Sequence, residues 1–397
     1  MKEGWEYKKL GEVCEILNGF AFKSSNYVPE GVRVIRITNV QKGYVEDNDP
    51  KYYPYETKDE LSRYLLKEGD MLLSLTGNVG RVAILEKSYL PAYLNQRVAC
   101  IRVRKGVELN LSFLFHLLYS QKFEDDCIKS SNGAAQLNMS TVWLASYLIP
   151  VPTLSEQQSI VDYLDAAFTK IDAMKANAEK ALNEAKALFQ ASLKEMLEPK
   201  EGWVEKTLKE VCSLITDGTH HSPPNNESGK YKYITAKNIR IWGLDLSNIT
   251  YVSEEVHKEI IARCNPKKGD VLYIKDGATT GIAIVNPLDE EFSMLSSVAL
   301  IKPNKDVLLS EFLCYTLNSP SIYNQTRNQM DGAAITRVTL VKIKGFVISI
   351  PPLSEQQSIV EYLDSLKSKV DRLQGNFDRI SQECDALKQA ILRQVFE

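Results

Sequence analysis

Two adjacent histidines, His220 and His221, are the residues whose type most directly suggests metal binding or general-base chemistry. They lie in a stretch rich in glycine and proline, so they lack the i, i+4 spacing that places two ligands on one helix face. The chain has four histidines in all, which is a small supply of ligands and bases. We therefore expect no metal site.

A nearby string, Ser222-Pro223-Pro224-Asn225, is the closest approach to the Asn-Pro-Pro-Tyr turn of amino-methyltransferases. Its first residue is wrong, and no glycine-rich cofactor loop accompanies it. No Walker motif, Gly-x-Ser-x-Gly elbow or His-Glu-x-x-His helix occurs either. The seven cysteines are scattered without a Cys-x-x-Cys pair, which predicts reduced, mostly buried thiols. These patterns predict a chain that is not itself an enzyme.

Length and composition indicate a globular protein of more than one domain. The 397 residues, 44% hydrophobic and 25% charged, suffice for two domains of about 150 residues with connectors. No apolar run approaches the roughly 18 residues of a membrane helix, and Met1–Trp5 lacks a signal-peptide core, so we expect a cytoplasmic protein. The net charge is −3. Any binding of nucleic acid would therefore rely on local basic patches or on a partner.

The chain contains an internal repeat. Leu-Ser-Glu-Gln-Gln-Ser-Ile-Val at Leu154–Val161 recurs unchanged at Leu353–Val360, 199 positions later. Gly4-Trp5, Gly69-Asp70 and Gly133-Ala134-Ala135 recur as Gly202-Trp203, Gly269-Asp270 and Gly332-Ala333-Ala334. A constant offset over half the chain predicts two copies of one unit, each a globular domain followed by a helix.

Each repeated segment carries the start signal of a long helix. Pro152 and Pro352 precede Ser-Glu-Gln-Gln strings that we interpret as capping boxes, with Ser155 and Ser354 as the caps. A spacing of alternately four and three then predicts a coiled-coil seam. The predicted seam comprises Ile160, Leu164, Ala167, Ile171, Met174, Ala178, Ala181, Ala185, Leu188 and Ser192, and in the second helix Ile359, Leu363, Leu366, Val370, Leu373, Phe377, Ile380, Cys384, Leu387 and Ile391.

Small residues in the first helix align with large ones in the second, which favours an intramolecular pair. The 32 residues from Ile160 to Ser192 give a rod of roughly 48 Å, longer than one turn of B-DNA at about 34–36 Å. The alternative is that each helix lies on its own domain.

β-Branched runs and short helical patterns recur in the same order in both globular parts. In the first half we expect strands at 32–40, 71–76, 82–86, 96–104 and 147–151 and a helix at 111–120. In the second half we expect matching strands at 232–240, 270–275, 281–285, 296–302 and 346–350 and a helix at 309–318. The predicted fold is thus α/β (α+β): two similar mixed domains with an antiparallel intramolecular coiled coil. The expected domains are 1–153 and 199–352, and the expected helices are 154–198 and 353–397.

Two variable α/β domains, each followed by a helix opening with Pro-x-Leu-Ser-Glu-Gln-Gln-x-Ile-Val, resemble the specificity subunit of type I restriction-modification systems. Further matching strings are Gly69–Asn78, Gly269–Tyr273 and Ile215–His220. The resemblance covers essentially the whole chain. Longer relatives carry an extra N-terminal helical segment, and because little precedes Trp5 we expect none here.

The resemblance implies that each globular domain reads one half of a split, asymmetric sequence in double-stranded DNA, and that the coiled coil sets the unread spacer. It also implies a complex with two adenine methyltransferase subunits and, when restriction occurs, with two motor-nuclease subunits. S-adenosylmethionine, ATP and Mg²⁺ would then belong to those partners, so this chain would hold no cofactor of its own.

Side chains that present paired donors and acceptors read base edges, whereas Lys, Ser, Thr and backbone amides contact phosphates. On this basis the expected DNA contacts in the first domain are Lys23, Ser24, Ser25, Asn39, Thr76, Asn78, Arg81, Asn95, Gln96 and Arg97. Those in the second are Thr219, His220, His221, Lys237, Asn238, Lys275, Thr279, Thr280, Ser296 and Ser297. The alternative for each is a polar residue that satisfies a turn or a strand end.

Two further groups recur in both copies. Gly133–Gln136 and Gly332–Ile335 have small residues that would allow close approach of a phosphate or of the coiled coil. The unchanged helix openings exceed what capping requires, so we expect them to dock the methyltransferases; the docking residues are Ser155, Glu156, Gln157, Ser354, Glu355 and Gln356.

Three functions of other classes remain open from the sequence. A stand-alone two-domain DNA-binding regulator would bind DNA tightly without partners. A coiled-coil adaptor would show no DNA preference. A nuclease or methyltransferase would turn over alone with Mg²⁺ or S-adenosylmethionine, which the missing motifs argue against.

Overall fold

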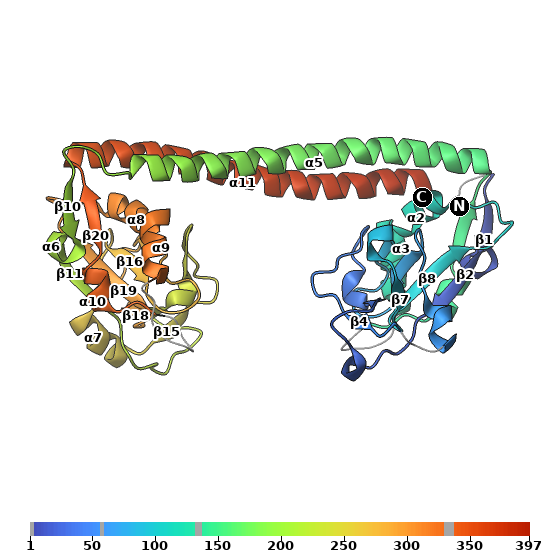
Figure 1. Cartoon of the computed structure of the whole chain (residues 1–397), viewed down its shortest axis with the longest axis horizontal. Coiled ribbons are helices and arrows are strands. Elements are labelled where there is room, and N and C mark those ends of the chain that lie inside the picture. The colour runs from blue at the N-terminus through green and yellow to red at the C-terminus, as the bar shows by residue number, and fades with distance from the viewer. Residues whose placement is uncertain (1–3, 56–58, 132–136, 329–336) are drawn as a thin grey trace. The chain divides into compact units, whose positions relative to one another are not determined.

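The computed structural model describes residues 4–55, 59–131, 137–328 and 337–397. The chain forms two compact units (Figure 1). Unit 1 comprises residues 1–178 and 377–397, and unit 2 comprises residues 179–376. Each unit therefore contains one globular part together with a section of both long helices, so the division falls within the helices rather than at their ends.

Unit 1 is built on a four-stranded antiparallel sheet in the order β2-β8-β5-β6. A three-stranded sheet, β4-β3-β7, pairs β3 and β7 in parallel, and β1 pairs β9 antiparallel. The strands are β1 Glu6–Lys9, β2 Cys14–Asn18, β3 Val32–Ile35, β4 Tyr52–Tyr53, β5 Met71–Ser74, β6 Val82–Ile84, β7 Ala92–Leu94, β8 Val98–Val103 and β9 Leu148–Val151.

Unit 2 repeats this topology. Its sheets are β11-β19-β16-β17, β15-β12-β18 and β10-β20, with β12 and β18 parallel, and it adds a small hairpin, β13-β14. The strands are β10 Val204–Thr207, β11 Cys212–Asp217, β12 Tyr231–Ile234, β13 Ile239–Arg240, β14 Gly243–Leu244, β15 Thr250–Val252, β16 Val271–Ile274, β17 Ala283–Val285, β18 Ser293–Met294, β19 Val298–Pro303 and β20 Val347–Ile350.

Short helices cover one face of each four-stranded sheet. In unit 1 these are α1 Leu10–Val13, α2 Leu111–Leu118, α3 Gln121–Ser130 and α4 Thr141–Ser146; in unit 2 they are α6 Leu208–Val211, α8 Ser310–Asn318, α9 Pro320–Asn328 and α10 Leu340–Lys344, with α7 Glu254–Arg263 beside β18. Asn110 starts α2, because its side chain accepts from the amides of Ser112 and Phe113.

The predicted strands exist but are shorter than expected. Every residue of β5 and β16 is buried, as continuous apolar runs predict. The strand expected over 32–40 ends at Ile35, where Arg36 leads into a 3-10 turn, Ile37–Asn39, and the second copy turns at Ala236–Asn238. Of the short helices, α2 and α8 were expected from the sequence, and α1, α3, α4, α6, α7, α9 and α10 were not.

The two long helices are α5, Leu154–Met196, and α11, Leu353–Phe396. They run antiparallel within each unit. In unit 1 Lys388 donates to Asp172 over 2.6 Å, and Lys175 lies 3.7 Å from Asp385. In unit 2 Lys186 donates to Gln374 over 2.8 Å. The expected antiparallel pairing within one chain is confirmed.

The predicted seam is only partly right. In α5 the predicted Met174 and Leu188 are 59% and 58% exposed, whereas Leu182, which was not predicted, is 3% exposed. In α11 the pattern holds up to Cys384 and fails at Leu387, which is 47% exposed. Alanine-rich α5 carries too few large side chains to distinguish one stripe from the adjacent one.

Both long helices are anchored in the domain cores. Val161 of α5 and Phe396 of α11 pack into the unit 1 core, and the Phe396 ring lies 5.5 Å from that of Phe113. Leu193 of α5 and Leu363 of α11 pack into the unit 2 core. Across the described residues, no helix is long and apolar enough to cross a membrane.

Candidate nucleic-acid interface

In unit 1 the predicted site residues lie at neighbouring strand ends. The loop 23–25 follows β2, and its side chains are exposed. The Phe20 amide donates to the Leu94 carbonyl, and the Gln96 amide donates to the Phe20 carbonyl, each over 2.9 Å. The structure therefore ties Phe20, which precedes this loop, to the turn 95–97.

The turn 76–81 joins the same group. The amide of Leu75 donates to the carbonyl of Arg97 over 3.0 Å, which ties the end of β5 to the turn 95–97. Asn78, Gln96 and Arg97 are exposed. Within the described part of the chain, the Arg97 guanidinium has no hydrogen bond or ion pair, so its donors are available to a ligand.

Other predicted residues of unit 1 are already bonded. Thr76 Oγ1 donates to Asn138 Oδ1 over 3.2 Å, and Arg81 Nη1 donates to Gln41 Oε1 over 2.6 Å. Asn95 Oδ1 accepts from the Arg97 amide over 3.3 Å. These side chains shape the surface, and a DNA contact by Arg81 would have to share its guanidinium with Gln41.

Unit 2 repeats the same backbone connections. The Thr219 amide donates to the Met294 carbonyl over 2.9 Å, and the Ser296 amide donates to the Thr219 carbonyl over 2.8 Å. The Lys275 amide donates to the Ser297 carbonyl over 3.0 Å. One scaffold thus presents different side chains at the same place in the two units.

A network around Asp217 alters the expected role of two residues. Asp217 is 1% exposed and accepts from Arg263 Nη2 over 2.6 Å. Lys275 is buried and lies 3.6 Å from Asp217 and 3.0 Å from Asp276. His220 Nε2 lies 3.3 Å from Asp217. Lys275 is therefore not free to neutralise a phosphate, because its charge balances two carboxylates.

The remaining predicted residues of unit 2 divide by exposure. His221, Lys237 and Thr279 are exposed, and Ser296 and Ser297 are half-buried. Thr280 is 0% exposed, and its hydroxyl donates to the Gly277 carbonyl over 2.8 Å. As placed, Thr280 holds its turn and cannot reach a ligand.

Asn39 and Asn238 occupy equivalent buried positions. Their Oδ1 atoms accept from the backbone amides of Arg36 and Thr235 over 2.8 and 3.0 Å. Their Nδ2 atoms donate to the carbonyls of Glu46 and Asp245 over 2.8 and 3.2 Å. At 3% and 6% exposure, both side chains serve the turn after the strand, so neither presents a free amide to a base.

The repeated helix openings have a structural role that sequence reasoning missed. Gln157 is 0% exposed, and its Nε2 donates to the carbonyls of Glu108 and Pro152 over 3.1 and 2.7 Å. Its Oε1 accepts from the Asn110 amide over 2.7 Å. Each glutamine of this kind fixes a long helix to its own domain.

Gln356 makes the same three bonds in unit 2, with the Val307 and Pro351 carbonyls over 2.8 and 2.9 Å and the Leu309 amide over 2.9 Å. It too is 0% exposed. The expectation that Gln157 and Gln356 lie on a docking surface is therefore wrong, because neither reaches the surface.

The predicted caps are also corrected. Helix α5 begins at Leu154, and Thr153 rather than Ser155 forms the box: its amide donates to Glu156 Oε2 over 3.1 Å, and its Oγ1 accepts from the Glu156 amide over 3.3 Å. Ser155 and Ser354 are exposed residues of the first turn.

In α11 the residue at the cap position is Pro352, which has no side-chain acceptor. Its carbonyl accepts from the amides of Glu355 and Gln356 over 2.9 and 3.0 Å. The Glu355 carboxylate accepts instead from Trp203 Nε1 over 3.2 Å. Of the six expected docking residues, Ser155, Glu156 and Ser354 are exposed and Glu355 is half-buried.

Six thiols are held in their neutral form by burial. Burial raises the pKa of Cys14, Cys212, Cys264 and Cys314 to about 12, and it raises the pKa of Cys100 and Cys127 further. These thiols stay protonated near neutral pH, so they are poor nucleophiles.

Burial also lowers the pKa of His116, despite the opposing effect of Asp165, whose Oδ1 lies 2.8 Å from His116 Nε2. The imidazole lies in the interface between α2 and α5. We assign this pair a structural role.

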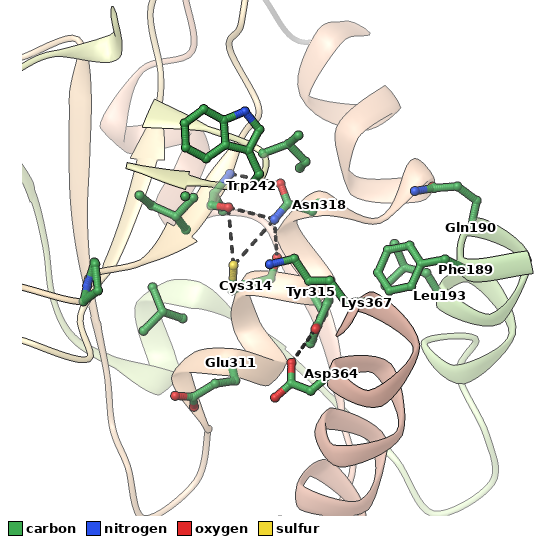
Figure 2. A pocket seen from close by; sticks show the side chains of 16 residues that line it. Phe189, Gln190, Leu193, Trp242, Glu311, Cys314, Tyr315, Asn318, Asp364 and Lys367 are labelled. Atoms are coloured by element: carbon green, nitrogen blue, oxygen red, sulfur yellow. Dashed lines mark hydrogen bonds between the residues drawn. The ribbon is translucent and has the colours of Figure 1, made fainter. Parts of the chain in front are cut away.

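A largely apolar cavity of about 410 Å³ lies in unit 2 between α5, α8 and the β13-β14 hairpin (Figure 2). Phe189 and Leu193 line one side and Trp242, which is 60% exposed, lines another. Asn318 Nδ2 is already bonded to the Ala283 and Cys314 carbonyls over 2.8 and 3.0 Å.

In unit 1 the positions equivalent to Asn318 and Lys367 hold Tyr119 and Phe168, whose ring centroids lie 6.5 Å apart. The cavity in unit 2 thus exists where two aromatic side chains are replaced by smaller or more polar ones.

The family described as the type I restriction modification DNA specificity domain matches the chain over residues 2–184 and 200–381. The two matches cover well over half of the sequence. The chain belongs to this family. Each match in this specificity-family chain contains one globular part and a large portion of the helix that follows it.

Curated relatives include the specificity subunit of the type I restriction enzyme EcoBI from Escherichia coli, which is 26% identical over 99% of this chain and 86% of that protein. The MjaVIII specificity subunit from Methanocaldococcus jannaschii is 31% identical over 46% of this chain and 44% of that protein.

Two solved structures share the fold. A chain from a study of complex assembly and conformational transition of the type I R-M system has a TM-score of 0.74 and 22% identity, covering 100% of this chain and 98% of that one. The HsdS subunit from Thermoanaerobacter tengcongensis has a TM-score of 0.53 and 21% identity, covering 100% and 97%.

Some residues of this specificity-family chain could not have been found from local sequence. Arg263 and Gln41 bond to site residues from positions far along the chain. Gly133–Gln136 and Gly332–Ile335 lie outside the described residues, so their predicted approach to phosphate stays a prediction.

Proposed function

We propose that this chain is the DNA-recognition subunit of a type I restriction-modification complex, in which each unit reads one half of a split, asymmetric sequence. One observation carries the proposal. The same three backbone bonds in both units place residues 95–97 and 295–297 beside the ends of β5 and β16, but the exposed side chains differ. A common scaffold with different exposed groups suits two different half-sites.

The long helices would set the interval between the two reading surfaces. At about 1.5 Å per residue, the 43 residues of α5 make a continuous helix of roughly 65 Å. Because each helix is bonded to a domain at its start through a buried glutamine, a change in helix length would be transmitted to the domains.

We assign catalysis to partner subunits, two methyltransferases and, in restriction, two motor-nucleases. S-adenosylmethionine, ATP and Mg²⁺ would be bound there, and the complex would work in the cytoplasm. Docking of the methyltransferases is supported by apolar side chains exposed at equivalent places on α5 and α11 near the openings. Leu154 and Leu353 are 45% and 38% exposed, and Tyr163 and Tyr362 are 53% and 45% exposed.

Docking can be tested by stoichiometry. Tyr163→Asp and Tyr362→Asp should each lower the number of bound methyltransferases from two towards one in native mass spectrometry, because each change places a charge in one apolar patch. Lys170→Ala and Lys369→Ala, at exposed equivalent positions, are the matched controls. Two bound subunits in both tyrosine variants would refute this docking surface.

The function is tested by long-read methylation mapping of a host with and without the chain. We expect one bipartite motif with methylated adenine to disappear when the chain is removed. A host methylome that does not change would refute the proposal. Tight, specific gel shift by the chain alone would instead favour a regulator that needs no partner.

A further inference from the structure

Unit 2 contains a polar cavity of about 670 Å³ whose lining includes three of the predicted DNA contacts, Lys237, Asn238 and Ser297. It is bounded by the loop after β11, the 3-10 turn 236–238, the loop between β14 and β15, and the turn after β18. Its volume is in the range of ligand sites, about 300–1,000 Å³. Side chains with hydroxyl or amide groups form much of its wall: Ser222, Asn225, Thr235, Asn248, Thr250 and Ser297.

One wall residue has an unmet hydrogen bond. Tyr233 lines the cavity and is 3% exposed, and its hydroxyl oxygen is buried without a hydrogen-bond partner among the described residues. Buried polar groups are nearly always bonded, so an isolated hydroxyl in a cavity wall indicates a partner that occupies the cavity.

The equivalent place in unit 1 carries different side chains. The β3–β7 register of unit 1 matches the β12–β18 register of unit 2, so Val34 corresponds to Tyr233. Arg36 stands where unit 2 has Thr235, and its Nη2 donates to the Asp49 carbonyl over 2.5 Å. Phe22, 9% exposed, packs against Tyr53 with ring centroids 4.9 Å apart. Unit 1 thus has, at the wall position held by Thr235 in unit 2, a longer side chain that is bonded to its own domain.

The shape and charge of the cavity restrict what it takes from DNA. Base edges in an intact duplex are recessed in a groove and are read by side chains that protrude into it. A concave site instead receives a group that projects from the duplex, either a phosphate or an unstacked base. Asp245 and Arg240 both line the wall, 3.7 Å apart, so their charges offset each other; Lys237 is an exposed lining residue, and the other groups named are neutral donors and acceptors. That lining suits a neutral base better than an anion.

We propose that this cavity receives one unstacked nucleobase from the half-site read by unit 2, an inference that rests on the proposed function. The Tyr233 hydroxyl bonds to the base edge, and Leu295 provides an apolar wall. Lys237, exposed at the rim, contacts a phosphate beside the extruded base. Unit 2 would therefore read one position by accepting the base rather than by touching its edge in the groove.

The test uses the full chain assembled with its methyltransferase subunits and duplexes that carry the mapped motif. Each base pair of the half-site assigned to unit 2 is replaced in turn by a mismatch, and in a second series by 2-aminopurine. At one position other than the methylated adenine, which a methyltransferase itself unstacks, we expect the mismatch to tighten binding at least threefold, because the cost of breaking the pair is already met. At that position 2-aminopurine fluorescence should rise at least threefold on binding.

Tyr233→Phe should abolish both effects at that position. Because the hydroxyl has no partner within residues 4–55, 59–131, 137–328 and 337–397, this change should not lower the melting temperature. Asn248→Trp, from an exposed rim position, should block the cavity and give the same loss. Tyr251→Phe is the matched control, a tyrosine of β15 that does not line the cavity, and it should leave both effects intact.

Two results would overturn this inference and leave the proposed function intact. In the first, the motif is recognised, but no mismatch tightens binding and no 2-aminopurine substitution raises fluorescence. In the second, Tyr233→Phe weakens binding to paired and mismatched duplexes equally, as loss of a contact to the DNA backbone would. Failure of the proposed function is distinct, because mapping would then yield no bipartite motif, and this inference would fall with it.

Discussion

The buried glutamines at the two helix openings give the sharpest prediction of stability. Gln157→Ala removes three hydrogen bonds, of 2.7, 2.7 and 3.1 Å, from a side chain that is 0% exposed. At a net value of about 1 kcal/mol each, we expect unit 1 to lose about 3 kcal/mol of unfolding free energy. For a unit of this size that corresponds to a fall of about 6–12 °C in melting temperature.

The neighbouring glutamine is the matched control. Gln158 is exposed; it donates to Asp162 on the same helix face over 2.8 Å and accepts one exposed bond from Asn110 Nδ2 of the domain over 3.0 Å. Gln158→Ala should therefore cost about 1 kcal/mol at most, well below the cost of Gln157→Ala. The same pair of changes in unit 2, Gln356→Ala and Gln357→Ala, should repeat the contrast.

The assay is urea and thermal unfolding followed by circular dichroism and tryptophan fluorescence. A third variant, Gln157→Glu, keeps the shape but turns a carboxylate towards two carbonyl oxygens, so it should be at least as damaging as alanine at neutral pH. If Gln157→Ala and Gln158→Ala lower stability equally, the reasoning that the repeated motif fastens helix to domain is refuted.

Three further predictions concern charge. Because burial holds the pKa of His116 below its ordinary 6.5, the unfolded chain binds the proton more readily, so the unfolding free energy should decrease as pH falls below about 6.5 and level off below the folded pKa. His116→Tyr, which copies the Tyr315–Asp364 bond of 2.5 Å in unit 2, should remove that dependence in pH-series melts, and a slope that persists would contradict the assignment. Lys275→Ala should cost about 2 kcal/mol in urea unfolding, because it removes the cation beside Asp276 and leaves buried Asp217 with Arg263 as its remaining Lys or Arg partner among the described residues. A stable variant that binds DNA more weakly would instead support the predicted phosphate contact of Lys275. Lys237→Ala should change the unfolding free energy by less than about 0.5 kcal/mol. It should reduce the slope of log affinity for DNA against log salt concentration by about one unit, and an unchanged slope would show that Lys237 does not contact a phosphate.

The repeat made the architecture predictable from sequence. Because the string at Leu154 returns at Leu353, both helix starts could be placed at the residues where the helices begin. Periodicity did not fix the seam, since Met174 and Leu182 are both apolar residues of an alanine-rich helix and only packing against α11 selects one of them.

The site was harder to predict because burial of a polar residue depends on distant partners. From the sequence, Lys275 is a reasonable candidate to bind a phosphate. In the structure it is buried and its charge is balanced in part by Asp217, which lies 58 positions earlier in the chain. Gln157 is likewise set by carbonyls of a separate loop. By contrast, Gln96 and Arg97 follow a short buried strand and are exposed, as expected of residues at a strand end.

The central claim is that each unit reads its own half of the target, and exchange of residues 1–150 for those of a relative with a different known target tests it most directly. Long-read methylation mapping of a host with the hybrid chain should show one half of the bipartite motif replaced and the other half and the spacer unchanged. A hybrid that alters both halves would contradict independent reading by the two units.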